Sequence, residues 1–335
     1  MRILAVYTHY PVSSGRYMTD AFQRQGHDVR HIGDSTGNQV WGIQVDAKYA
    51  HASDGDITTR WPDWTPDLVL VMDSAFAFHH PYYPDVPHAV YGVDSHVRNY
   101  RQYGITRYFL AHKAVSIQPF EDDCEWLPCG FDPVWFTPSM IPWDEREYDV
   151  AMIGVLYPRR VELLNALSAA GLKVAAGMGA LYDQYRDVYQ NARISLCVSA
   201  NHDVAQRVFE TATMGCAILS DPLPDMRTIG TVADRKSGAV YAEYEDADGA
   251  VKIAQALLAD GAGQKMALEG QRWAIHHTWD ARAQRIVDWW QGEYAPKPKG
   301  GRKGKADAAT DGVDSDRNAG APEGDGDGAP GDSGA

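Results

Sequence analysis

The sequence of 335 residues has no long apolar run and few cysteines. No stretch of about 18 apolar residues occurs, so we expect no membrane-spanning segment. The cysteines, Cys124, Cys129, Cys197 and Cys216, have no zinc-ligand spacing, which predicts reduced thiols and a cytoplasmic protein. The opening residues 1–7 are too few for the apolar core of a signal peptide and are predicted to form a strand.

Basic residues are also scarce. The chain has 31 Lys and Arg against 45 Asp and Glu, a net charge of −14. An acidic surface disfavours nucleic acid or an anionic membrane as the main partner, although a local basic patch on such a surface is still possible.

Large apolar side chains are missing from the end of the chain, where Val313 is the only aliphatic residue larger than alanine. We therefore expect residues 295–335 to be a disordered tail.

The remaining residues alternate between short apolar runs and helical patterns, which is typical of an α/β fold with parallel sheets. The first series of expected strands is Arg2–Tyr7, Asp28–Ile32, Asp67–Met72, His88–Val93 and Ala114–Ile117. After a proline-rich stretch at 128–147, the second series is Tyr148–Ile153, Lys173–Ala176, Arg193–Ser199, Cys216–Ser220 and Gly238–Tyr241. The pattern predicts two tandem Rossmann-like domains, 1–140 and 141–278, that face a cleft. A final helix at 279–294 is expected to pack back on the first domain.

Ligands of open α/β sheets bind beyond the carboxyl ends of the strands. Ser13, Ser14 and Gly15 follow the first strand and precede a helix, where free amides attract anions. The alternative is a plain turn that caps the helix. The two interpretations stay open for this segment.

A second helix start follows the strand Tyr148–Ile153. Gly154 allows close backbone approach, and Arg159 and Arg160 stand in the first helical turn after Pro158. Arginine in the first turn interacts unfavourably with the helix dipole unless an anion is bound there. A guanidinium group can donate two parallel hydrogen bonds to phosphate oxygens. Ordinary exposed arginines are the alternative.

The densest polar segment is 199–216. Asn201 or Asp203 can cap a helix at Ala205–Met214, and Arg207 and Glu210 are neighbours on one face of that helix. An ordinary surface ion pair is the alternative. The segment follows a strand of the second series, so the pair is expected in the cleft.

The run Arg207–Cys216 resembles the donor-binding signature of two-Rossmann (GT-B) glycosyltransferases. It is most similar to the family-4-like branch with spore-protein (CgeB/YkvP-like) glycosyltransferase domains. Trp126–Pro133 with Phe136–Pro138 resembles the linker of that family, Tyr148–Gly154 the start of its donor domain, and His277–Arg282 its closing run. These motifs cover about residues 124–286 in the family order, while the N-terminal half matches only in pattern.

The resemblance implies a role for each matching residue. Glu210 would accept hydrogen bonds from the donor ribose, and Arg207 with Arg159 or Arg160 would neutralise the departing diphosphate. The reaction would need no metal and no cofactor besides the nucleotide-sugar co-substrate. His202 stands where many members have glutamate, which leaves the contacts to the transferred sugar open.

Asp94 and His96 follow the expected strand His88–Val93 and are the candidate catalytic residues. In an inverting enzyme either could deprotonate the acceptor hydroxyl, whereas in a retaining reaction they would only position the acceptor. The alternative is that Asp94 or Ser95 caps a helix that begins near His96. His9 is a second candidate of the same kind.

The resulting hypothesis is a glycosyltransferase, expected to be retaining, that moves a hexosyl or pentosyl group to a hydroxyl of a glycan, protein or small molecule. Modified DNA is a less favoured acceptor, supported only by the basic and aromatic residues of 98–113. Two other classes stay open. A nicotinamide oxidoreductase would need a glycine fingerprint that is incomplete at 177–182, and a non-catalytic two-lobed binding protein would keep the fold without the chemistry.

Overall fold

The computed structural model describes residues 1–72, 82–101, 104–230 and 238–295. The predicted tail from Pro296 onward lies outside the described residues. Met1–Ala295 form one compact unit. No helix within the described ranges is long and apolar enough to cross a membrane.

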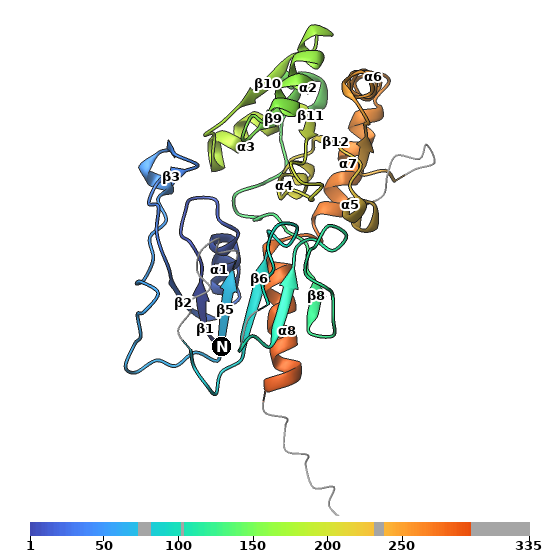
Figure 1. Cartoon of the computed structure of the whole chain (residues 1–335). Helices are drawn as coiled ribbons and strands as arrows, with labels where there is room; N and C mark the ends of the chain where they lie inside the picture. Colours follow the sequence, from blue (N-terminus) through green and yellow to red (C-terminus); the bar gives the residue numbers. More distant parts are fainter. Residues whose placement is uncertain (73–81, 102–103, 231–237, 296–335) are drawn as a thin grey trace, which may run out of the picture. The chain divides into compact units, whose positions relative to one another are not determined.

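The first half of the chain forms a parallel sheet of six strands in the order β2-β1-β5-β6-β7-β8 (Figure 1). The strands are β1 (Arg2–Val6), β2 (Asp28–Ile32), β5 (Leu68–Met72), β6 (His88–Gly92), β7 (Arg107–Leu110) and β8 (Cys124–Trp126). β5 and β6 are buried throughout, as expected for central strands of a parallel sheet that is covered on both faces. Helix α1 (Ser14–Arg24) links β1 to β2, and the Ser13 hydroxyl accepts a hydrogen bond from the amide of Arg16 to cap it.

One predicted strand of this half is wrong. Ala114–Ile117 form no strand, and the chain enters the sheet earlier, at Arg107–Leu110. Tyr108, Phe109 and Leu110 are buried between β6 and β8, whereas the backbone amides of Lys113 and Ala114 donate to the Asp225 carboxylate. The predicted run is therefore a loop that is held by a side chain from another part of the chain.

The second half forms a parallel sheet of five strands in the order β10-β9-β11-β12-β13. They are β9 (Tyr148–Ile153), β10 (Val174–Gly177), β11 (Ala192–Cys197), β12 (Ala217–Ser220) and β13 (Tyr241–Glu243). The helices are α2 (Pro158–Ala169), α3 (Tyr182–Gln190), α4 (Arg207–Thr213), α5 (Pro224–Ile229), α6 (Ala247–Leu258), α7 (Ala262–Ala274) and α8 (Trp279–Tyr294). The predicted α/β class with two parallel sheets is confirmed. The last strand lies later than Gly238–Tyr241, and the helix predicted from Ala205 begins at Arg207.

The linker motif and the closing run, which are far apart in the sequence, lie side by side in the structure. Phe131 pairs with Thr278, and the amide of Trp279 donates to the carbonyl of Phe131 at 2.9 Å. The Arg282 guanidinium donates to the carbonyls of Pro128 and Cys129. The linker and the closing run are thus adjacent, and both motifs hold the start of α8 in place.

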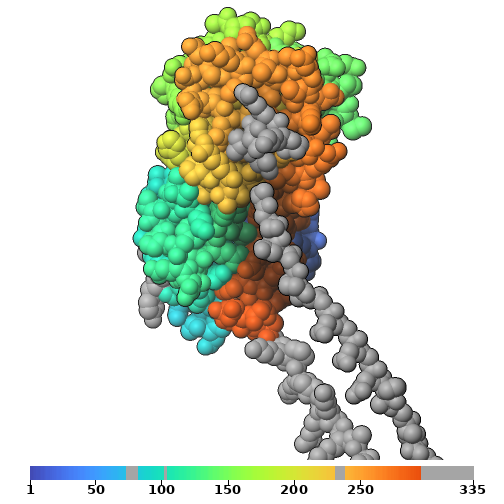
Figure 2. All heavy atoms as spheres, turned by 90° about the vertical axis from the view of Figure 1, so that its right-hand side faces the viewer, coloured from blue at the N-terminus to red at the C-terminus, as the bar shows by residue number. Residues whose placement is uncertain are grey.

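Helix α8 returns to the first half of the chain. It packs against α1, where Arg24 pairs with Asp280. It also reaches β8, where Arg285 pairs with Glu125. Figure 2 shows the red-orange end of the described chain beside the teal part of the first half. The buried Trp279 ring stacks on Tyr17 with ring centroids 6.2 Å apart. These contacts place the last helix of the chain on the first sheet's helical layer.

Candidate active site

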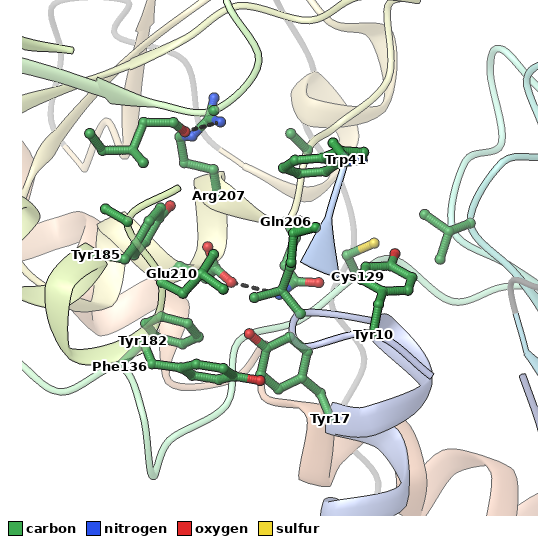
Figure 3. Close-up of a pocket in the computed structure, with 18 of the residues that line it drawn as sticks. Tyr10, Tyr17, Trp41, Cys129, Phe136, Tyr182, Tyr185, Gln206, Arg207 and Glu210 are labelled. Atoms are coloured by element: carbon green, nitrogen blue, oxygen red, sulfur yellow. Dashed lines mark hydrogen bonds between the residues drawn. The ribbon is translucent and has the colours of Figure 1, made fainter. Parts of the chain in front are cut away.

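A cavity of about 300 Å³ lies between side chains from both halves of the chain (Figure 3). Its lining includes residues that follow strands of both sheets: Val93 after β6, His112 after β7, Gly154 after β9 and Asp203 in the loop after β11. This is where open parallel sheets bind ligands. The volume is at the lower end of the range for small-molecule sites.

Glu210 lies on α4 and lines the cavity. Its side chain is nearly buried, and Gln206 Nε2 donates to Glu210 Oε1 at 2.6 Å. Burial raises the pKa of Glu210, while the hydrogen bond from Gln206 and the charge of Arg207 act in the opposite direction. The site therefore presents a carboxylate that is costly to keep charged without a polar ligand.

Arg207, the first residue of α4, also lines the cavity. Its Nη2 donates to the carbonyl of Ile153 at 2.5 Å. Its buried Nε and Nη1 have no hydrogen-bond partner within the described residues. Gly154 makes this position possible, because a Cβ there would lie 2.5 Å from Arg207 Nη2 and because its φ is +149°. The glycine thus makes room for a guanidinium group.

The two arginines of α2 do not line the cavity. Arg160 is nearly buried and donates to the carbonyls of Val155 and Val198, so its donors are already used. Arg159 pairs with the buried Asp221. Both stand in the first turn of α2 as expected, but each already has a protein partner there.

Gly15 and His202 also lie outside the cavity lining. A Cβ on Gly15 would meet the Tyr7 ring at 2.4 Å, so packing explains this glycine without a ligand. His202 is exposed and has left-handed backbone, with φ of 60°. The neighbouring residue, Asp203, reaches the cavity instead.

The candidate catalytic residues Asp94 and His96 stand next to the cavity without lining it. The amide of Asp94 donates to the Tyr100 hydroxyl at 2.9 Å, and His96 Nε2 lies 3.1 Å from Asn201 Nδ2. No helix begins near His96 within residues 82–101, so the interpretation of Asp94 or Ser95 as a helix cap is wrong. The Ser95 hydroxyl instead donates to the carbonyl of His112.

His112 is a cavity residue that the sequence analysis missed. It is 1% exposed, and burial lowers the pKa of its imidazole. Nearby, burial opposes ionisation of Asp203, yet the Ser199 hydroxyl and the imidazoles of His112 and His96 hold the Asp203 pKa below its usual value. His112 could have been found from its position two residues after a strand, because ligands bind beyond the carboxyl ends of strands. The strand was wrongly predicted at 114–117 instead of Arg107–Leu110, so this position was missed.

An aromatic side chain reaches the cavity from a hairpin. Strands β3 (Gln39–Val40) and β4 (Ile43–Gln44) are joined by Trp41 and Gly42, whose φ values are 49° and 76°. Two successive positive φ values are typical of the type I′ turn of tight hairpins. Trp41 lines the cavity although it is 66% exposed, so this large ring is available to a ligand.

Two arginines of the basic stretch 98–113 are paired with acidic neighbours. Arg101 forms ion pairs with Glu121 and Asp123, and Arg107 pairs with Glu125. These contacts reduce the positive charge that Arg101 and Arg107 could offer to a nucleic-acid backbone.

Comparisons with known proteins agree with this architecture. Residues 140–288 match the family model described as glycosyl transferase-like. No curated protein matches the sequence at a significant level. The glycosyltransferase AviGT4 of avilamycin A biosynthesis superposes with a TM-score of 0.60 at 15% identity, covering 87% of this chain and 97% of that one.

Two further similar structures contain UDP. Anabaena HepE in complex with UDP has a TM-score of 0.57 at 9% identity, covering 87% of this chain and 99% of the other. An alpha-glucosyltransferase in complex with UDP and DNA has a TM-score of 0.57 at 9% identity, covering 88% and 100%. The chain has the GT-B fold. The candidate donor residues Gly154, Arg207 and Glu210 lie within the matched part of this GT-B chain, and all three line its cavity.

Proposed function

We propose that the protein is a glycosyltransferase that takes its sugar from a nucleotide-sugar. The observation that carries the proposal is the pairing of Glu210 and Arg207 in one cavity inside the segment that matches the glycosyl transferase-like family. The solved GT-B structures with UDP or UDP-glucose support the same donor class.

In the proposed complex, Glu210 accepts hydrogen bonds from the donor ribose and Arg207 contacts the diphosphate. One oxygen of Glu210 is held by Gln206, which fixes the carboxylate in the cavity. The unpartnered Nε and Nη1 of Arg207 gain acceptors when phosphate oxygens enter. Positive charge on the diphosphate stabilises the leaving group as the sugar–phosphate bond breaks. Arg159 could contact the diphosphate only if its ion pair with Asp221 were replaced by one with a phosphate oxygen.

We propose a retaining reaction that needs no divalent cation at the donor, because Arg207 supplies the charge that a metal would otherwise supply. Asp94 and His96 are then positioning groups for the acceptor hydroxyl, and His112, which lines the cavity, faces the transferred sugar. We further propose a cytoplasmic enzyme and a glycan, protein or small-molecule acceptor. The ion pairs of Arg101 and Arg107 disfavour DNA.

The test is a screen of nucleotide-sugars for binding and slow hydrolysis, without added Mg²⁺ or Mn²⁺, with NAD as the comparison ligand. We expect one nucleotide-sugar to bind and to be hydrolysed, and Arg207→Met to abolish both. Binding with neither hydrolysis nor transfer to any acceptor would favour the two-lobed binding protein. Preference for NAD would favour the oxidoreductase. The anomer of the first-formed product, followed by NMR, tests retention.

A further inference from the structure

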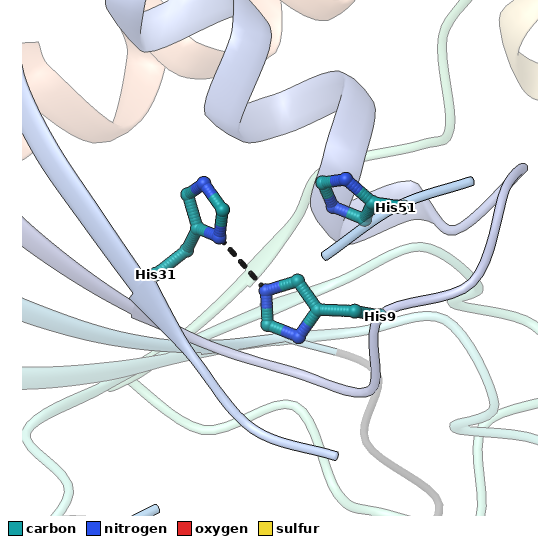
Figure 4. Close-up of side chains that lie close together, drawn as sticks. All are labelled: His9, His31 and His51. Carbon is teal, nitrogen blue, oxygen red and sulfur yellow. Dashed lines mark hydrogen bonds between the residues drawn. The ribbon is translucent and has the colours of Figure 1, made fainter. Parts of the chain in front are cut away.

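Three histidines from separate segments meet at the carboxyl ends of β1 and β2 (Figure 4). His9 follows β1, His31 belongs to β2, and His51 follows the short 3₁₀ helix Ala47–Tyr49. One ligand nitrogen from each ring lies within 4.8 Å of the other two. His9 Nε2 is 2.9 Å from His31 Nδ1. None of the three lines the cavity described above, so this cluster is separate from the proposed donor site.

Hydrogen bonds from the backbone amides of the three histidines hold their segments in place. The amide of His9 donates to the carbonyl of Asp34 at 2.6 Å, and the amide of His51 donates to the carbonyl of Gly37 at 3.2 Å. The amide of His31 donates to Asp54 Oδ2 at 2.9 Å. The imidazoles are therefore held near one another by the fold itself, which is the preorganisation that a metal site requires.

The surroundings suit neutral imidazole ligands. His9 is fully buried and its ring stacks on Tyr7 with centroids 4.1 Å apart. An imidazole enclosed in this way is costly to protonate, so it keeps a lone pair free for a metal ion. The buried Nδ1 of His9 makes no hydrogen bond within the described residues.

Polar groups stand behind two of the rings, as they do in known metal sites. Asp54 Oδ2 lies 3.6 Å from His31 Nε2, the nitrogen that faces away from His9. The Tyr7 hydroxyl lies 2.8 Å from His51 Nε2. A carboxylate or other polar partner on the second nitrogen orients a metal-bound histidine and strengthens its ligand nitrogen.

We propose that His9, His31 and His51 bind one Zn²⁺ ion. Zinc–nitrogen bonds of about 2.0–2.1 Å put tetrahedral ligand atoms about 3.4 Å apart, so small side-chain rotations suffice to close the cluster on the metal. A water molecule would complete the tetrahedron. The ion would join the loops after β1 and β2 to the segment around His51.

The test uses the full chain without an affinity tag, freed of metal by dialysis against a chelator. Titration with Co²⁺, read by visible absorption, should show an intense tetrahedral band that saturates at one equivalent and that Zn²⁺ displaces. His31→Gln and His51→Gln should weaken binding at least 100-fold, whereas His276→Gln, which changes an exposed histidine outside the cluster, should bind as the wild type does.

Thermal denaturation provides a second measurement on the same proteins. Added Zn²⁺ should raise the midpoint of the wild type and of His276→Gln, but not that of His51→Gln, because a ligand that binds only the folded state stabilises it. The proposal is overturned if the wild type shows no tetrahedral Co²⁺ spectrum. It is also overturned if His31→Gln and His51→Gln bind the metal as tightly as His276→Gln does.

Discussion

The replacement Glu210→Gln tests the proposed donor site most directly. It keeps the size of the side chain and an oxygen that Gln206 can still reach, but it removes the charge. A hydrogen bond to a charged group contributes about 1.5–3 kcal/mol, and losing one such bond to the ribose corresponds to roughly 10- to 100-fold weaker binding. We expect that loss in the affinity for UDP and for the preferred nucleotide-sugar, measured by isothermal titration calorimetry.

The same variant should not be less stable. Because burial raises the folded-state pKa of Glu210 above its unfolded value, the ionised carboxylate costs stability at pH above the folded pKa. That cost disappears as the pH falls toward the unfolded pKa. The neutral glutamine removes the cost at every pH, so the free energy of unfolding at neutral pH should be equal to or greater than that of the wild type. Denaturant unfolding at several pH values measures this.

Glu162→Gln is the matched control, since Glu162 is exposed on α2. It should change neither ligand affinity nor stability. The raised pKa also predicts that donor affinity of the wild type is lost on acidification at a higher pH than for an ordinary glutamate, and that Glu210→Gln abolishes this pH dependence. If folded Glu210→Gln binds UDP as tightly as Glu162→Gln does, the ribose assignment is refuted.

Three other substitutions probe the surroundings of the cavity. Gly154→Ala forces a Cβ against the guanidinium of Arg207 at a positive φ, and we expect a loss of about 1–3 kcal/mol in stability, seen by thermal denaturation, together with weaker UDP binding. Trp41→Ala removes a largely exposed ring, so stability should change by less than about 0.5 kcal/mol while KM rises several-fold in steady-state kinetics; an unchanged KM would exclude a ligand contact. Asp225→Ala leaves two loop amides without their acceptor, and denaturant unfolding should show a loss of about 1–3 kcal/mol.

Much of the architecture was predictable because it depends on local patterns. Short continuous apolar runs such as Leu68–Met72 are typical of central strands. Turn residues between such runs indicate parallel sheets with crossover helices. The spacing of Arg207 and Glu210 puts both side chains on one helix face whatever the rest of the chain does. Three of the motifs that suggest a glycosyltransferase, Tyr148–Gly154, Arg207–Cys216 and His277–Arg282, lie within residues 140–288, which match the family model, whereas the linker motif precedes them.

The sequence by itself determined the two parallel sheets and the helix that carries Arg207 and Glu210. Tertiary structure decided which polar groups are left for a ligand. The guanidinium group of Arg160 already donates to backbone carbonyls. Gly15 is needed for close packing against the Tyr7 ring rather than for a ligand. His112 faces the cavity only because the strand before it lies at Arg107–Leu110. The three histidines share no sequence motif, and only the pairing of β1 with β2 and of His51 with Gly37 brings them together. The physical reason is that secondary structure follows from neighbours along the chain, whereas the partners of a polar side chain depend on segments that meet only after folding.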